Sequence, residues 1–223
     1  MSEARDEILA GIRRSLGVSA TDTTRRQIVE ARIAAAARGV LPQRGEGAVP
    51  TRAATFQAQA ESVAASVARV AGDADIPAEI ARFLRENNLP ATLRMGEDTR
   101  LGALPWDATT IGISKGPSNG DDLNAVSHAE AGVAETGTLV LVSGPDNPTT
   151  LNFLPDNHIV VLRADAIAAN YEDVWSELRT RFGKGLMPRT VNLITGPSRS
   201  ADIEQKMLLG AHGPRRLHIV IVG

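Results

Sequence analysis

The sequence predicts an α/β fold: a three-layer αβα sandwich around a mostly parallel open sheet, with a helical arm at the N-terminus. Two observations carry this prediction. Short apolar runs alternate with amphipathic helical stretches through the C-terminal half, which is typical of a parallel sheet covered on both faces. Before residue 50 the chain instead contains two helical stretches followed by a segment rich in glycine and proline.

The composition is that of an ordinary globular protein, with 43% hydrophobic and 22% charged residues among 223. The net charge of −2 gives no general electrostatic reason to bind nucleic acid or an anionic membrane. The sequence contains no cysteine, which excludes disulfides, thiolate metal sites and a cysteine nucleophile. We therefore expect a cytoplasmic protein, without a signal peptide or a membrane span.

The first 50 residues are predicted to form a helical arm with a linker, and residues 51–223 the main domain. Ile8, Ile12 and Leu16 share one helical face, and Gly17 is a plausible helix end. A second helix is expected from about Thr24 to Arg38. Two interpretations remain open for the arm: a cap or self-association surface, which would make a homo-oligomer, or a surface for a different partner.

In the main domain, an apolar stripe from Phe56 to Val70 predicts a helix, and Pro77 suits the first turn of the next one. The alternating elements that follow are expected as strands at 91–95, 109–114, 138–142, 158–162, 190–195 and 217–222, and as helices at 171–182 and 201–209. We expect strand 138–142 to be buried in the middle of the sheet, because its run TLVLV is apolar on both faces.

Polar residues stand directly before that buried strand, in the segment ETGT. Glu135 is the first candidate for a catalytic residue, because a carboxylate beside a core strand can act as a base, a nucleophile or a hydrogen-bond anchor. Thr136, Gly137 and Thr138 are candidate ligand contacts. The alternative is a structural carboxylate that accepts hydrogen bonds from backbone N–H groups at a turn.

A second candidate site is the segment GPSRSADIE, predicted to lie between a strand and a helix. Gly196, Ser198 and Arg199 could hold a phosphate or carboxylate at the start of that helix, and Asp202 lies in its first turn. Simple helix capping explains the same residues equally well. The segment is neither a phosphate-binding Walker loop nor a dinucleotide fingerprint, because their glycine and lysine patterns are absent.

Two histidines complete the candidates. His158 opens a predicted strand, and His212 lies in a tight turn. If the sheet there is parallel, we expect this turn at the opposite end of the sheet from the Gly196 loop. A histidine in a turn is more often exposed and idle than functional. No two histidines have metal-ligand spacing, so no metal site is predicted.

Four ordered motifs resemble the lactate utilisation protein C family, the small cysteine-free members of the LUD-domain proteins. They are AEAGVAETGTLVLVSG (129–144), LPDNHIVVL (154–162), GPSRSADIE (196–204) and GAHGPRRLHIVIVG (210–223). The resemblance implies a fold like that of the NagB/RpiA/CoA-transferase superfamily. It carries over the motif positions, but no defined catalytic residue set.

The resemblance also implies a role in bacterial oxidation of L-lactate to pyruvate, with iron–sulfur clusters held by partner proteins. The expected function is therefore a non-redox accessory subunit of that system, with no cofactor in this chain. The alternative hypothesis is a stand-alone enzyme or binding protein for a small anionic or phosphorylated metabolite. The sequence leaves open whether the chain is an enzyme.

Overall fold

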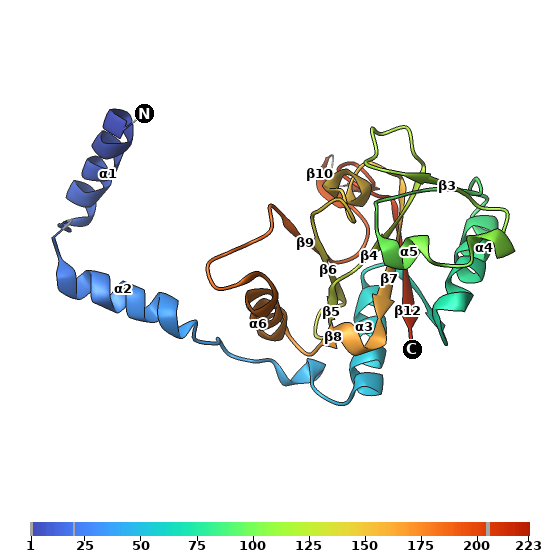
Figure 1. Ribbon diagram of the computed structural model, residues 1–223, viewed down its shortest axis with the longest axis horizontal. Helices are drawn as coiled ribbons and strands as arrows, with labels where there is room; N and C mark the ends of the chain where they lie inside the picture. The colour runs from blue at the N-terminus through green and yellow to red at the C-terminus, as the bar shows by residue number, and fades with distance from the viewer. Residues whose placement is uncertain (1, 20, 204–205) are drawn as a thin grey trace. The chain divides into compact units, whose positions relative to one another are not determined.

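The computed structural model describes the backbone of residues 2–19, 21–203 and 206–223, and it separates into two compact units, residues 1–40 and 41–223 (Figure 1). The first unit contains α1 (Ser2–Leu16) and α2 (Thr23–Ala35). Asp22 caps α2 by accepting a hydrogen bond from the Arg25 backbone N–H at 2.9 Å. Ile8, Ile12 and Leu16 are exposed on α1, and none of the residues of α2 is buried. The predicted helices of the arm are present.

The second unit is built on a six-stranded sheet in which every strand pair is parallel. In spatial order its strands are β1 (Ser66–Val70), β12 (Arg216–Val222), β7 (Asn157–Arg163), β4 (Asn124–His128), β2 (Thr92–Met95) and β3 (Gly112–Lys115). The central strands β4 and β7 are buried almost throughout. Strands buried on both faces read as continuous apolar runs, which is why the sequence revealed them.

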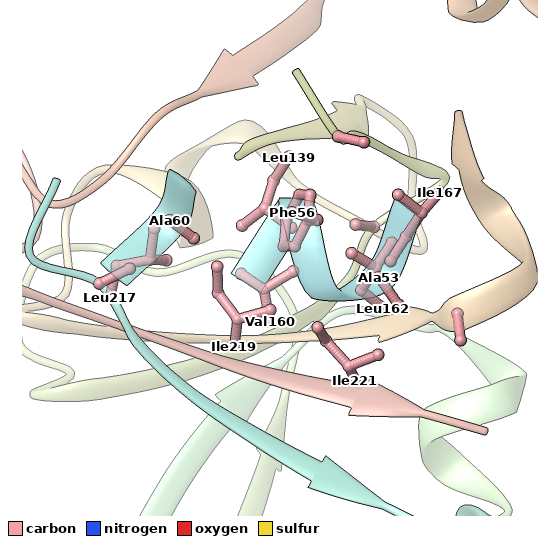
Figure 2. Close-up of a cluster of buried hydrophobic side chains, with 14 of the residues drawn as sticks. Ala53, Phe56, Ala60, Leu139, Val160, Leu162, Ile167, Leu217, Ile219 and Ile221 are labelled. Carbon is pink, nitrogen blue, oxygen red and sulfur yellow. The ribbon is translucent and has the colours of Figure 1, made fainter. Parts of the chain in front are cut away.

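Helices cover both faces of this sheet, which confirms the predicted α/β sandwich. On one face, α3 (Val49–Ser62) packs Phe56 into the core. Figure 2 shows Phe56 between α3, β6 and the sheet, surrounded by Ala53, Ala60, Leu139, Val160, Leu162, Ile167, Leu217, Ile219 and Ile221. The other face is covered by α4 (Ile76–Glu86) and α5 (Thr99–Gly102), which pack on the alternate residues of β7 and β12.

A second, four-stranded sheet lies beyond α3, in the order β8 (Ile167–Ala168), β5 (Ala131–Val133), β6 (Thr138–Val142) and β9 (Val191–Ile194). Helix α6 (Tyr171–Phe182) covers its outer face through Val174 and Leu178. Strand β6 is buried as predicted, but it lies in this smaller sheet and is antiparallel to both β5 and β9. A run that is apolar on both faces predicts a buried strand, but it does not indicate which of the two sheets contains that strand.

Two predicted helices are wrong in whole or in part. The stripe from Phe56 to Val70 is helical only to Ser62, because Ala64 adopts a left-handed φ of 67° and the valine-rich end pairs with β12. Residues 201–209 do not form a helix. Their backbone forms an antiparallel hairpin of β10 (Arg199–Ile203) and β11 (Lys206–Leu209), in which the two segments satisfy each other's hydrogen bonds.

Short 3₁₀ turns connect several elements: η1 (Gln43–Gly45), η2 (Asp73–Asp75), η3 (Trp106–Ala108), η4 (Thr149–Asn152) and η5 (Ala164–Ala166). The second unit begins at Leu41, and Gly45 is already buried in it. The predicted division into an arm of residues 1–50 and a domain of residues 51–223 stays a prediction. Among the described residues, none of the helices combines the length and apolar character needed to cross a bilayer.

Candidate functional site

A cavity of about 280 Å³ lies at the amino ends of β7 and β12 and brings together half of the predicted site residues. Five of them line it: His158, Gly196, Ser198, Arg199 and His212. They come from three separate parts of the chain, namely the start of β7, the segment from the loop after β9 to the first residue of β10, and the loop before β12. Convergence of polar groups from distant segments in one hollow is typical of a binding site.

The Gly196 and His212 loops are joined directly by Ser198. Its Oγ accepts a hydrogen bond from the His212 backbone N–H at 3.3 Å, and its own N–H donates to the Pro214 carbonyl at 2.8 Å. The prediction that these two loops lie at opposite ends of the sheet is therefore wrong. The strand before the Gly196 loop, β9, belongs to the smaller sheet, and β10 and β11 pair with each other as a hairpin. The loop before this hairpin and the loop after it therefore lie at the same place.

The Gly196 loop is held closely against the end of α3. Gly196 adopts a φ of 80°, and a Cβ at this position would lie 2.6 Å from the Val63 carbonyl oxygen. The Arg199 guanidinium donates a hydrogen bond to the same carbonyl. Arg199 is the only lysine, arginine, aspartate or glutamate lining the described cavity, so its wall carries a positive charge.

Buried polar residues form the floor of the cavity. His158 and Asn152 both line it, and each is only 1% exposed. Ser127 on β4 connects them: the His158 Nε2 lies 3.0 Å from Ser127 Oγ, which in turn donates to Asn152 Oδ1 at 3.4 Å. In the described part of the chain, His158 Nδ1 and Asn152 Nδ2 have no hydrogen-bond partner. A buried polar atom left without a partner is costly, and each such atom requires an explanation.

Burial also fixes the charge state of His158. Desolvation alone lowers the pKa of the imidazole to about 3, because the charged form is disfavoured away from water. His158 is therefore neutral throughout the physiological pH range. A neutral imidazole can exchange hydrogen bonds with a ligand but cannot supply a cationic partner for an anion.

The ETGT segment lies one hydrogen bond away from this cavity. Thr138 Oγ1 lies 2.7 Å from Thr136 Oγ1, 2.8 Å from the Tyr171 hydroxyl and 2.7 Å from Thr195 Oγ1. Thr195 lines the cavity, whereas Thr136 and Thr138 do not. Gly137 permits close packing on α3, since a Cβ there would lie 2.4 Å from the Ala60 nitrogen. The segment thus supports one wall of the cavity.

Glu135, the candidate catalytic residue, does not line the cavity. Its side chain is buried, and Oε1 accepts a hydrogen bond from the Tyr171 N–H at 3.3 Å, in the first turn of α6. A carboxylate at this position interacts favourably with the helix dipole. This contact matches the structural alternative stated above, while the catalytic role stays a prediction.

The side chain of Asp202 lies outside the described residues, and its backbone is in β10 instead of the first turn of a helix. Among the described residues there is no group of three or more histidine, aspartate or glutamate side chains that could hold a metal ion.

Asn152 and Ser127 were missed by the sequence analysis. Ser127 is a polar residue within the buried strand NAVSH, and a hydroxyl in a fully buried strand needs a partner. That signal was available. Asn152 had no comparable signal, because it ends a 3₁₀ turn whose burial depends on the tertiary fold.

Residues 124–222 match the family model of the LUD domain, and these residues include the whole lining of the cavity. The predicted resemblance is confirmed by curated relatives named lactate utilization protein C. The chain is 35% identical over 98 residues to the one from a Geobacillus species, covering 44% of this chain and 41% of the relative. To the one from an Exiguobacterium species it is 33% identical over 118 residues, covering 52% and 51%.

The chain thus spans about half the length of the curated relatives it matches. A crystal structure of a DUF162 family protein from Deinococcus radiodurans has the same fold, with a TM-score of 0.59 and 20% identity over 80% of this chain and 100% of that one.

Proposed function

We propose that this protein takes part in lactate utilisation and that its cavity binds a small carboxylate of that process. One observation carries the proposal: the match to the LUD-domain model spans residues 124–222, which contain the complete cavity lining, and the chain is similar to proteins named lactate utilization protein C. A site built within the shared part of the chain is the best candidate for the shared function.

The cavity suits a small anion by size and by charge. Its volume of about 280 Å³ is just below the range of drug-sized pockets, so it fits a metabolite of a few heavy atoms. Arg199 supplies a positive charge on the wall, and Asn152 and His158 are polar residues of the lining. Exposed apolar side chains of Phe153 and Leu193 border the same hollow and could cover a methyl group.

The same proposal assigns the chain a non-redox role beside partner proteins that hold iron–sulfur clusters, with no cofactor of its own. The absence of cysteine from the sequence agrees with this division of labour. The arm would provide the assembly surface, because Ile8, Ile12 and Leu16 expose one apolar face of α1.

The direct test is genetic complementation in the organism that carries this gene. Deletion should abolish growth on L-lactate and leave growth on pyruvate normal, and the full-length chain should restore it. His158→Gln should fail to restore growth, whereas the exposed Arg85→Ala on α4 serves as a matched control that should succeed. Normal growth of the deletion strain on L-lactate would overturn the proposal.

The arm is tested separately by deleting residues 1–40. The cut stops at Val40 because Gly45 is buried, and a Cβ there would lie 2.0 Å from the Ala169 carbonyl oxygen. The truncated chain should fold with an unchanged unfolding midpoint but lose co-purification with its partner proteins or with itself. Retention of both associations would exclude the arm as the assembly surface.

The second candidate function is a binding protein or enzyme for another small anionic or phosphorylated metabolite. Arg199 and the Gly196 loop favour it, because a guanidinium beside a tight glycine loop also suits phosphate. Thermal-shift measurements with L-lactate, pyruvate, coenzyme A esters and nucleotides would distinguish the two. A shift with a phosphorylated compound and none with lactate or pyruvate favours the second function.

A further inference from the structure

We propose that a second cavity binds a small molecule that carries a phosphate group, through the guanidinium groups of Arg215 and Arg216. This cavity is separate from the one assigned above to a small carboxylate, and the inference does not depend on the function proposed for that one. It gives the chain a second ligand, of a different chemical class.

The second cavity lies at the amino ends of β1 and β12 and has a volume of about 350 Å³. Three segments line it: the turn before β1 with the first residues of that strand, the last turns of α4, and the start of β12. Pockets for small molecules have volumes of ~300–1,000 Å³. The cavity therefore has room for a phosphate group together with a small organic body.

Arg216 presents a guanidinium that is held in place without losing its charge. Its Nη1 donates a hydrogen bond to Asn157 Oδ1 at 3.2 Å. The amide of Asn157 is buried and its orientation is fixed, because Nδ2 donates to the Leu123 carbonyl at 3.1 Å and to Asn124 Oδ1 at 2.9 Å. Among the described residues, Arg216 forms no ion pair with a carboxylate. A neutral acceptor thus positions the cation and leaves its remaining N–H groups for a ligand.

Arg215 is placed beside it by the backbone. The N–H groups of Arg215 and Arg216 both donate to the Asp156 carbonyl, at 2.7 and 3.2 Å. The stem of Arg215 packs against Gly210, where a Cβ would lie 2.1 Å from Arg215 Cγ. Its ion pair with Asp156 is long, 3.8 Å from Nε to Oδ1, and joins side chains that are 61% and 47% exposed. Such a pair contributes little, so Arg215 is available to an anion.

The lining of this cavity has an excess of positive charge, since it contains three arginines and one glutamate. The third arginine, Arg82 on α4, is already paired with Glu86 in the lining and with Glu79 outside it. His218 adds no charge, because burial lowers its pKa to about 4. The charge that attracts a ligand therefore comes from the two arginines at the start of β12.

Two neighbouring guanidiniums favour phosphate over carboxylate. A phosphate monoester carries a charge of about −1.5 to −2 near neutral pH and three terminal oxygens, so it can bind both groups at once. A carboxylate has one charge and two oxygens, which a single guanidinium satisfies through paired N–H groups. Phe83, Val67 and Leu217 supply an apolar part of the lining for the body of the molecule.

The two cavities adjoin each other, and Leu217 lines both. The Val63 carbonyl that accepts from Arg199 immediately precedes Ala64, which lines the second cavity. A phosphate compound that binds the protein must therefore be assigned to one cavity by substitution. Arg199→Gln reports on the first cavity, and Arg215→Gln and Arg216→Gln report on the second.

Calorimetric titration of the full-length protein at constant ionic strength is the first measurement, with inorganic phosphate, glycerol 3-phosphate and glycerol as probes. We expect saturable binding of both phosphate compounds and none of glycerol. Arg215→Gln and Arg216→Gln should each weaken binding about tenfold or more, because each removes charged hydrogen bonds. Arg216→Lys keeps the charge but loses the planar fork, so an intermediate loss of about threefold is expected.

Arg189→Gln is the matched control, since it removes one exposed positive charge outside both cavities. It should change the affinity by less than about twofold, because distant surface charges are screened by salt. Urea denaturation of every variant checks that it is folded. As a second measurement, the arginine Nε–H signals of Arg215 and Arg216, assigned with the variants, should shift with glycerol 3-phosphate and much less with acetate.

Three results would overturn the inference. The first is the absence of saturable phosphate binding to the unaltered protein. The second is an equal loss of affinity in Arg189→Gln and Arg216→Gln, which would mean that only the net charge matters. The third is binding that is lost in Arg199→Gln but retained in Arg215→Gln and Arg216→Gln, which would place the phosphate in the first cavity.

Discussion

Two buried histidines on neighbouring strands have opposite hydrogen-bonding environments. His158 on β7 and His218 on β12 are each 1% exposed, and their strands pair directly, with His158 opposite Leu217. His218 has both ring nitrogens paired, Nδ1 at 2.8 Å from Ser66 Oγ and Nε2 at 3.2 Å from Glu79 Oε1. It also stacks on Phe83 at a centroid distance of 4.2 Å.

His158 differs in its hydrogen bonding. One ring nitrogen is bonded within the protein, and the other has no partner in the described structure although its residue lines a cavity. Burial and residue type are the same at both positions, so neither distinguishes a structural histidine from a ligand-binding one. What distinguishes them is an unpaired ring nitrogen in a residue that lines a cavity.

The largest expected effect is on stability at the fully paired histidine. His218→Ala removes the ring that packs on Phe83 and takes a partner from the side chains of Ser66 and Glu79, so we expect a loss of about 3 kcal/mol in the free energy of unfolding. Urea denaturation measures it. The exposed His212→Ala is the control, expected within about 0.5 kcal/mol of the parent protein. Equal losses for the two variants would contradict the structural role of His218.

Mild acid should affect both buried histidines in the same direction. The folded-state pKa is lowered by burial to about 3 for His158 and about 4 for His218, below the ordinary value of 6.5 for histidine. Between the folded-state and unfolded-state pKa values, these histidines bind more protons in the unfolded chain than in the folded protein. The free energy of unfolding that each neutral imidazole contributes is therefore fully present above pH 6.5 and is lost as the pH falls toward the folded-state pKa.

From pH 7 to pH 5 we expect a loss of about 2 kcal/mol for each of these histidines, measured by urea denaturation at both values. Stopping at pH 5 keeps the test above the usual pKa range of the carboxylates. His158→Gln should lose about 2 kcal/mol of this pH dependence, because it removes one buried imidazole and leaves His218 and the less buried His128, whose pKa burial also lowers. An unchanged slope would show that His158 is already protonated or accessible to water in the folded protein.

A smaller effect is expected at Glu135, which resembles His218 in that its observed contact is internal. Glu135→Gln keeps an acceptor for the Tyr171 N–H but removes the charge at the start of α6, so we expect a loss of about 1 kcal/mol in unfolding free energy. Growth on L-lactate should remain. If the variant is stable and growth is abolished, Glu135 has a catalytic or binding role that the comparison of the two histidines would not have identified.

The sequence predicted elements whose patterns are local. The run TLVLV is β6, and the predicted helix at residues 171–182 has the same bounds in the structure. Valines after Ser62 fitted both helical spacing and a strand, and only pairing with β12 decided between them. The hairpin formed by β10 and β11 likewise depends on pairing within the folded chain.

For the candidate site, motif position predicted five lining residues but not their arrangement. His158, Gly196, Ser198, Arg199 and His212 line one cavity, although His212 was expected at the far end of the sheet. The floor was harder to find. Ser127 and Asn152 matter because of which atoms lack partners after folding, and a pattern of residue types does not contain that information.

The central claim is that the cavity at His158 is the ligand site of this protein. The most direct measurement is calorimetric titration of L-lactate into the full-length chain and into His158→Gln, with urea denaturation of both as the check on folding. The claim predicts saturable binding to the parent protein, weakened by about tenfold or more in a variant that remains folded. The same affinity for both proteins would contradict it.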